Sequence, residues 1–181
     1  MKSAIWDAAT DLFAEKGYDE TTVDEIADRA GISRRSFFRY FASKSDLMAS
    51  GAVDYAEFLT DAIRACPRGS SVSEVVRRTV LQVAQHCTAI PRTRKVMQIV
   101  AKCPAAKEAL DSRAAELRER VDAAFTSRGR AFRDLPAGVL TDLTLAILDV
   151  VFHFWFRQGV QDIQTSANEV LATLGRMTFD D

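Results

Sequence analysis

This 181-residue sequence has few of the residues that mark disulfide-rich, metal-binding or catalytic proteins. Its three cysteines, Cys66, Cys87 and Cys103, are an odd number without a C-x-x-C pair, which argues against a disulfide framework and against structural zinc. The only two histidines, His86 and His153, are too far apart in sequence for an H-E-x-x-H motif. No G-x-S-x-G elbow, P-loop or Rossmann glycine pattern occurs. We therefore expect no metal, no cofactor and no enzymatic activity.

The chain also lacks an excess of charge and a long uninterrupted apolar run. Lys and Arg number 24 against 25 Asp and Glu, so attraction to nucleic acid would require local clustering of basic residues. The most apolar stretch, 145–156, is interrupted by Asp149 and His153 and is shorter than a bilayer-spanning helix, and no secretory signal pattern opens the chain. These features predict a cytoplasmic protein that binds no membrane.

What the sequence does contain is helical periodicity throughout. Apolar residues recur at helical spacing, and the four prolines stand where helices can begin or end. We predict an all-α fold of about nine helices, in which Ser43 caps a long fourth helix and Ser166 with Glu169 forms a capping box. The helices expected after the fourth are at 71–89, 91–102, 104–128, 136–159 and 166–177.

Three short helices are predicted at the N-terminus. Thr22 and Glu25 fit a T-x-x-E capping box, Gly31 fits a tight turn, and Ser33 can cap a third helix. This order has the outline of a helix-turn-helix unit. We therefore divide the chain into a head, residues 1–45, and a helical body for ligand binding and dimerisation, residues 46–181.

The segment RAGISRRSFFRYFASK, residues 29–44, concentrates five basic residues and no acidic one. Arg34 and Arg35 near the start of a helix in a major groove can each donate two hydrogen bonds to guanine, while Phe38 can contact a thymine methyl or stack against a sugar. The side chains suited to phosphate oxygens are Thr22, Ser36, Tyr40 and Lys44. A solvated face and a surface for an acidic protein are the alternatives, but the coincidence of cap, turn and cluster favours duplex DNA.

These residues also carry a family resemblance. The stretch from Ile5 to Met48, with its AATDLFAEKGY, TTVDEIA and AGISRRSFFRYFASK elements, resembles the N-terminal domain of TetR-family regulators. The resemblance implies a dimer whose recognition helices enter successive major grooves and whose body binds a small-molecule effector. The positions that it implies face DNA are Thr22, Ser33, Arg34, Arg35, Ser36, Phe38, Arg39, Tyr40 and Lys44. Phe38 departs from the tyrosine that is frequent in the family.

The function predicted from these patterns is a ligand-responsive repressor of a palindromic operator. An activator of the same family is the alternative, and a helical acyl-group hydrolase is the rival from another class. The ISRRSFFRYF variant is similar to a branch, frequent in actinobacteria, whose bodies are described as acyl-CoA-like ligand-binding domains, which suggests an apolar or acyl-type effector.

Effector contacts in the body are expected among aromatic, Met and His side chains, although such residues at helical spacing more often form plain core. The candidates are Phe58, His86, Met97, Phe125, Phe152, His153 and Trp155. Asp149 and His153, at i and i+4, could serve the ligand, the core or a subunit interface, and the sequence leaves these three roles open.

The helices at 136–159 and 166–177 carry more apolar surface than one packing face needs, which favours a four-helix interface between two copies of the chain. A central helix in a monomer is the alternative for 136–159. The candidate interface residues are Leu140, Leu143, Ile147, Val151, Val170, Leu171 and Leu174.

Overall fold

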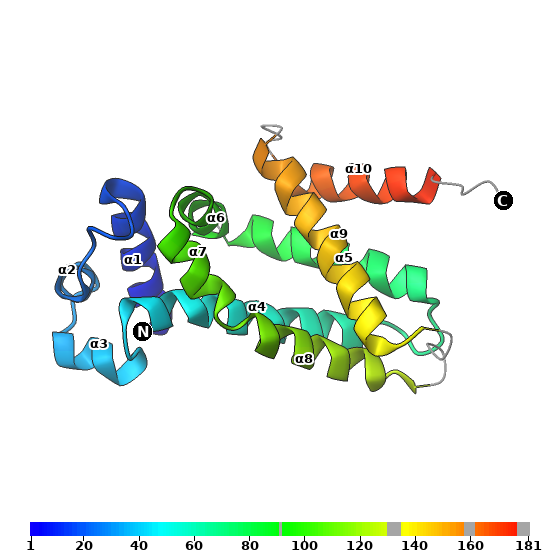
Figure 1. Ribbon diagram of the computed structural model, residues 1–181, viewed down its shortest axis with the longest axis horizontal. Coiled ribbons are helices and arrows are strands. Elements are labelled where there is room, and N and C mark those ends of the chain that lie inside the picture. The colour runs from blue at the N-terminus through cyan, green and yellow to red at the C-terminus, as the bar shows by residue number, and fades with distance from the viewer. Residues whose placement is uncertain (91, 130–134, 158–161, 177–181) are drawn as a thin grey trace. The chain divides into compact units, whose positions relative to one another are not determined.

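The computed structural model describes residues 1–90, 92–129, 135–157 and 162–176, and the described chain is helical without strands (Figure 1). This confirms the predicted all-α class. The helices are α1 (Lys2–Lys16), α2 (Val23–Arg29), α3 (Arg34–Tyr40), α4 (Lys44–Ala65), α5 (Val72–Ala89), α6 (Arg92–Lys102), α7 (Pro104–Asp111), α8 (Ala114–Thr126), α9 (Ala137–Arg157) and α10 (Ile163–Arg176).

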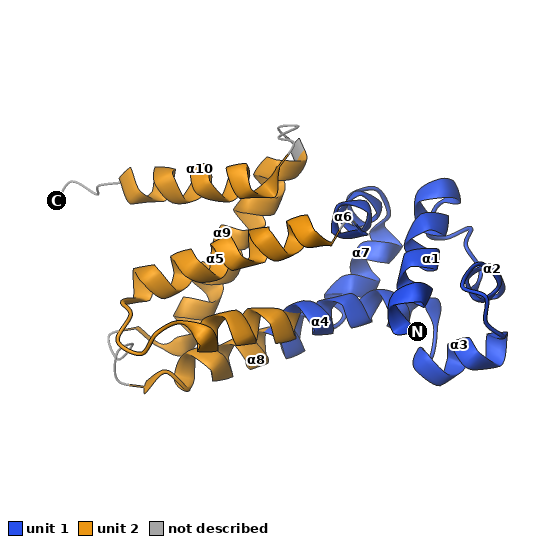
Figure 2. Cartoon of the chain, turned by 180° about the vertical axis from the view of Figure 1, so that it is seen from behind, with its two compact units in different colours: residues 1–55, 91–117 blue, residues 56–90, 118–181 orange. Residues whose placement is uncertain are grey.

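The chain forms two compact units, coloured separately in Figure 2. Unit 1 comprises Met1–Tyr55 and Pro91–Leu117, and unit 2 comprises Ala56–Ile90 and Arg118–Asp181. This division differs from the predicted boundary between residues 45 and 46, because α6 and α7 pack with the N-terminal helices. Ile99 of α6 belongs to the same buried apolar cluster as the core residues of α1, α2 and α3.

Large apolar side chains from successive helices fill the core of unit 1. Ile5, Ile26, Phe37 and Leu47 are fully buried there. Burying a side chain of this size contributes roughly 1.5–3 kcal/mol. The core therefore fixes the short helices α2 and α3, which would be marginal in isolation.

Ion pairs join α1 to α6 on the surface of unit 1. Arg92 lies 3.0 Å from Asp7 and Lys95 lies 2.6 Å from Asp11. Exposed pairs of this kind contribute little to stability. They orient α6 on α1, whereas burial of Ile99 supplies the stronger attachment.

In unit 2, α10 packs against both α5 and α9. At the end of α4, Arg128 donates hydrogen bonds to the carbonyl oxygens of Ile63, Cys66 and Pro67 at 2.9, 2.8 and 2.7 Å. Terminal carbonyls of a helix lack partners within the helix, so the Arg128 guanidinium caps α4.

By length and composition alone, the segment Ala137–Phe156 of α9 is long and apolar enough to cross a membrane. The shorter stretch 145–156 considered in the sequence is not. The same composition suits a core helix. Leu140, Leu148 and Val151 are buried in unit 2, and α9 contacts α5 and α10.

Two predicted helix boundaries are wrong. The helix predicted at 104–128 is divided into α7 and α8 at Ser112, whose hydroxyl donates a 2.7 Å hydrogen bond to the carbonyl oxygen of Ala109 and so competes with helical pairing. The capping box expected at Ser166 is absent because α10 already begins at Ile163, where the Asp162 carboxylate accepts from the Gln164 N–H at 3.1 Å. The predicted ends at residues 159 and 177 lie outside the described residues.

Candidate DNA interface

The turn between α2 and α3 is built as the sequence predicts. The Thr22 hydroxyl accepts from the Glu25 N–H at 3.3 Å, and the Glu25 carboxylate accepts from the Thr22 N–H at 2.9 Å, which completes the capping box. Gly31 has φ +66°, a left-handed conformation that favours glycine. Ser33 then caps α3 by accepting from the Ser36 N–H at 3.1 Å.

Helix α3 has an apolar inner side and a basic outer side. Phe37 is fully buried in unit 1, whereas Phe38 is 44% exposed. Arg35, Phe38 and Arg39 are exposed and, together with Ser36, line an open hollow on the surface. Helix α3 carries no acidic residue. Its outer side can therefore approach a polyanion.

The two predicted base-reading arginines differ in their surroundings. Arg34 is held by Asp24 of α2, whose two carboxylate oxygens lie 2.9 and 2.7 Å from Nη1, and its guanidinium lies 5.4 Å from the centre of the Phe38 ring. Arg35 makes no hydrogen bond or ion pair with the described part of the chain. Arg35 is thus ready for a base edge, whereas Arg34 must first leave Asp24.

Arg39 and Tyr40 form a local pair at the end of α3. The Arg39 Nη2 donates to the Tyr40 hydroxyl at 3.3 Å, and its guanidinium lies 5.1 Å from the centre of the Tyr40 ring. Both groups keep a polar atom at the helix surface, consistent with phosphate contact.

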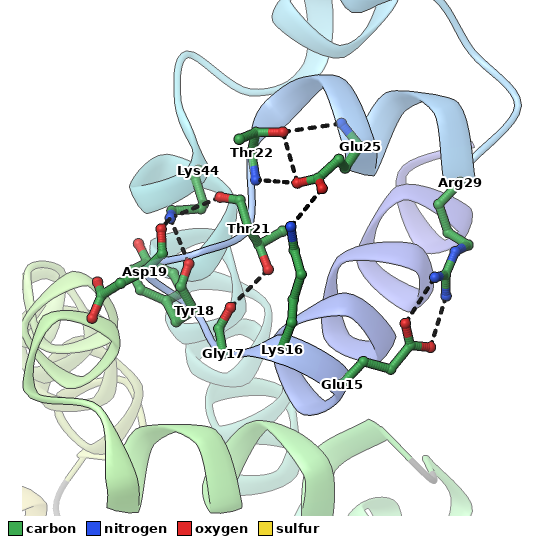
Figure 3. Close-up of polar contacts among 10 residues, drawn as sticks. All are labelled: Glu15, Lys16, Gly17, Tyr18, Asp19, Thr21, Thr22, Glu25, Arg29 and Lys44. Carbon is green, nitrogen blue, oxygen red and sulfur yellow. Dashed lines mark hydrogen bonds and ion pairs between the residues drawn. The ribbon is translucent and has the colours of Figure 1, made fainter.

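Lys44 has a different environment from the one expected for a phosphate contact (Figure 3). Its ammonium group donates to the carbonyl oxygens of Tyr18, Asp19 and Thr21 at 2.5, 3.2 and 2.9 Å and lies 4.4 Å from the centre of the Tyr18 ring. Burial lowers the pKa of Lys44, although nearby Asp19 opposes this effect. An ammonium has three hydrogens, and all three are directed to the loop between α1 and α2. Lys44 therefore holds α4 to that loop.

Thr22 is likewise engaged within the chain. Its hydroxyl donates to the Glu25 carboxylate at 2.8 Å, and Lys16 donates to the same carboxylate at 2.5 Å (Figure 3). The Lys16 hydrogen bond, with those from Thr22, lowers the pKa of Glu25 to about 2. Thr22 is exposed, so a phosphate contact through its hydroxyl would compete with the capping box.

The carboxylates that orient this basic face were not predicted from the sequence. Glu15 binds Arg29 through two hydrogen bonds of 2.9 and 2.8 Å, so Arg29 is neutralised by α1 (Figure 3). Asp24 does the same for Arg34. Neither pair has a local spacing signal, because its partners are 14 and 10 residues apart on different helices.

The candidate effector residues do not share one environment. Phe58 and His86 stack in unit 2, with ring centres 3.9 Å apart and planes 15° apart. Met97 belongs to unit 1. The remaining candidates lie on unit 2 helices, where Phe125 and Trp155 are buried, Phe152 is partly buried and His153 is exposed. Asp149 is also exposed, which excludes a core role for the Asp149–His153 pair within the subunit.

The candidate interface residues divide into inner and outer groups. Leu140, Ile147 and Val151 are buried within unit 2 itself, so they belong to the subunit core. Leu143 and Leu174 are 44% and 41% exposed. Val170 and Leu171 are partly buried.

Helix α9 also has an exposed apolar face, next to the candidate interface residues. The sequence pattern did not distinguish the residues of this face from those of the core. Val139, Leu143 and Val150 are each 44% exposed or more. Their spacings of four and seven residues place them on one side of the helix.

The fold and the basic face together define a helical protein with a helix-turn-helix head. Residues 5–50 match the model of the bacterial regulatory proteins of the tetR family. It is 37% identical over 73 residues to the HTH-type transcriptional regulator YdeS of Bacillus subtilis, covering 40% of this chain and 35% of that one. It is 38% identical over 63 residues to the biofilm operon icaADBC negative transcriptional regulator IcaR of Staphylococcus aureus, covering 35% of this chain and 34% of that one.

The match thus spans about a third of the length of these curated relatives. The fold likeness extends further. The crystal structure of the transcriptional regulator FadR from Bacillus subtilis in complex with stearoyl-CoA aligns with a TM-score of 0.70 and 17% identity, covering 99% of this chain and 100% of that one. At this identity the likeness concerns the fold.

Proposed function

We propose that this chain is a cytoplasmic, ligand-responsive transcriptional repressor that binds a palindromic operator as a homodimer. The observation that carries the proposal is the outer face of α3, where Arg35, Phe38 and Arg39 stand exposed on a capped helix without acidic residues. An arginine can bind guanine O6 and N7 together, and an aromatic ring can contact a thymine methyl.

A two-fold dimer suits this kind of head. Palindromic half-sites lie about 34–36 Å apart, one turn of duplex, and a dimer presents one recognition helix to each. The exposed side chains of Val139, Leu143 and Val150 on α9 and of Leu174 on α10 support an isologous interface through these helices. IcaR is named as a negative regulator, which supports repression as the sign of control.

Unit 2 is the proposed sensor of a small, largely apolar effector. Helix α4 is continuous from unit 1, which ends its first segment at Tyr55, into unit 2, which begins at Ala56. An effector that prefers the DNA-incompetent conformation by about 3 kcal/mol would weaken operator binding roughly a hundredfold. Such a preference lies within ordinary allosteric coupling.

The test is selection of bound fragments from random or genomic DNA, followed by anisotropy titration with excess competitor duplex. We expect a palindromic site whose binding survives the competitor and is weakened by Arg35→Ala. Arg68→Ala is the matched control because Arg68 is exposed in unit 2 and equally charged. If all duplexes bind alike, or if both variants lose equally, the proposal is wrong.

A further inference from the structure

The interior of unit 2 holds polar side-chain atoms that have no hydrogen-bond partner among the described residues. They include Oγ1 of Thr60 in α4, Oδ1 of Asp122 in α8 and Oγ1 of Thr141 in α9. Thr60 is 7% exposed and Thr141 is fully buried. A buried polar atom without a partner is costly and rare in native proteins, so each such atom calls for an explanation. Thr79 and Ser166 share the property but lie on other helices, α5 and α10.

Other helical threonines of this chain satisfy their hydroxyls locally. Thr10, Thr88 and Thr144 each donate to the carbonyl oxygen four residues earlier, at 2.7, 3.0 and 2.7 Å. This local bond is open to any helical threonine. Thr144 makes it one turn beyond Thr141 on the same helix, whereas Thr141 and Thr60 do not. Their hydroxyls are therefore available to another partner.

Side-chain contacts set the alignment of α4 with α8. Arg120 lies 3.6 Å from Glu57, and Arg128 donates to the Ile63 carbonyl oxygen at 2.9 Å. Residue numbers rise together along the two helices, so they run parallel. Thr60, midway between residues 57 and 63, therefore lies within about one helical turn, 5.4 Å along the axis, of Asp122.

A second set of contacts aligns α8 with α9. Asp122 Oδ2 lies 4.0 Å from the position that a Cβ on Gly138 would take, and Arg118 pairs with Asp142. The two helices are thus antiparallel. Thr141 stands three residues beyond Gly138, and therefore within about one helical turn, 5.4 Å along the axis, of the level of Asp122. Among the described residues, and apart from the neighbouring backbone of α9, Asp122 Oδ2 is the only atom within 4 Å of that Cβ position.

We propose that Thr60, Asp122 and Thr141 form the polar end of an effector site that binds the ammonium group of an amphipathic primary amine. The three side chains offer three oxygen acceptors, one of them a carboxylate, and an ammonium offers three donors. The buried apolar neighbours Leu59, Val121 and Leu140 on the same helices suit an alkyl or aryl tail. The inference rests on the proposed sensing role of unit 2 and replaces an acyl-type effector by a cationic one.

Isothermal titration calorimetry at pH 7 tests this assignment with three probes of equal chain length: n-octylamine, n-octanoate and octan-1-ol. We expect the full-length protein to bind n-octylamine at least tenfold more tightly than the other two. Thr60→Val, Thr141→Val and Asp122→Asn should each weaken n-octylamine binding at least fivefold. Glu119→Gln, an exposed change on α8, is the control and should leave it unchanged. Equal binding of octanoate or octanol, no binding of the amine, or unchanged binding by Asp122→Asn overturns the proposal.

Thermal unfolding without amine separates binding from folding. Thr60→Val and Thr141→Val should leave the unfolding temperature unchanged or raise it, because each removes an unsatisfied hydroxyl at constant shape. A lowered temperature would show that the hydroxyls already have partners and would contradict the site. Operator binding is measured separately. Selective DNA binding without amine binding would contradict only the amine site. Amine binding without selective DNA binding would contradict only the proposal that the protein is a transcriptional regulator.

Discussion

The ammonium group of Lys44, at the start of α4, lies 2.5 Å from the carbonyl oxygen of Tyr18, in the turn that follows α1. Two further carbonyl oxygens, of Asp19 and Thr21, accept from the same group. Lys44 belongs to the basic segment of the sequence, but its hydrogen bonds connect the start of α4 to the α1–α2 loop within unit 1. We therefore expect Lys44 to affect DNA binding indirectly, through the position of the α1–α2 loop.

Replacing Lys44 by Met removes the three donors and retains an unbranched stem. We expect the free energy of unfolding to fall by about 1–3 kcal/mol, because three carbonyl oxygens of the α1–α2 loop lose a charged donor. Urea unfolding measures the change, with Lys102→Met, an exposed change on α6, as the control. The variant could instead keep the stability of the wild type while the salt dependence of its DNA binding falls by about one phosphate contact. That result would support the phosphate contact predicted for Lys44 from the sequence.

The contrast between Arg34 and Arg35 leads to a prediction about specificity. Arg35→Ala should relax the preference at one base pair per half-site, because removing a bidentate arginine–guanine pair costs about 1–3 kcal/mol of discrimination. Arg34→Ala should cost less, because the wild-type guanidinium must give up Asp24 before it reaches a base. Titration against operators varied at single positions measures both effects. A larger loss of specificity for Arg34→Ala would reverse the assignment.

Local patterns in the sequence predicted the parts of the head that depend on neighbouring residues. The Thr22–Glu25 capping box, the Gly31 turn and the Ser33 cap are each decided within four residues, and all three are confirmed. Phe37 and Phe41, four residues apart at helical spacing, are likewise both buried.

Features that depend on distant partners were not predictable in this way. The acceptors of Lys44 are backbone carbonyl oxygens, which every residue carries, so no residue type signals them. On α9 nearly every position is apolar, and packing against neighbouring helices, among them α5 and α10, separates buried Leu140 from exposed Leu143.

Glu25 should give unit 1 a measurable acid dependence. The Lys16 hydrogen bond, followed by those from Thr22, lowers its pKa from 4.5 to about 2. A carboxylate with a depressed pKa stabilises the folded state above its unfolded pKa, and this stabilisation is lost as pH falls from about 4.5 through about 2. The stability difference between wild type and Glu25→Gln should therefore shrink across this window. Urea midpoints from pH 6 to pH 2 measure it.

Glu108→Gln, an exposed change on α7, provides the matched control for that titration. Its difference from wild type should stay nearly constant over the same pH range. If the stability difference between Glu25→Gln and the wild type is equally independent of pH, the Glu25 carboxylate does not have the ion-pair environment described for it.

Gly51 permits a close approach of α4 to the Trp6 ring. A Cβ at this position would lie 3.1 and 3.2 Å from two ring carbons, and the ring is fixed by a 3.0 Å hydrogen bond from its Nε1 to Ser50. Gly51→Ala should destabilise unit 1 by about 1–3 kcal/mol through overpacking, offset in part by the helical preference of alanine. Gly175→Ala, on α10, where no described residue would lie within 4 Å of the added Cβ, should instead gain up to about 1 kcal/mol. Equal gains in thermal unfolding would rule out the packing argument.

The exposed side of α9 gives a test of the dimer that does not disturb the subunit core. Leu143→Arg introduces a charge where Leu143 is 44% exposed, so the isolated subunit tolerates it, whereas a paired copy would bury two like charges. We expect sedimentation equilibrium to show a monomer, and circular dichroism to show the helix content of the wild type. Gln82→Arg, exposed on α5, should leave the dimer intact. Because a monomer presents one recognition helix, the Leu143→Arg variant should bind a single half-site and the full palindrome with equal affinity. If this variant remains a dimer, the interface lies elsewhere.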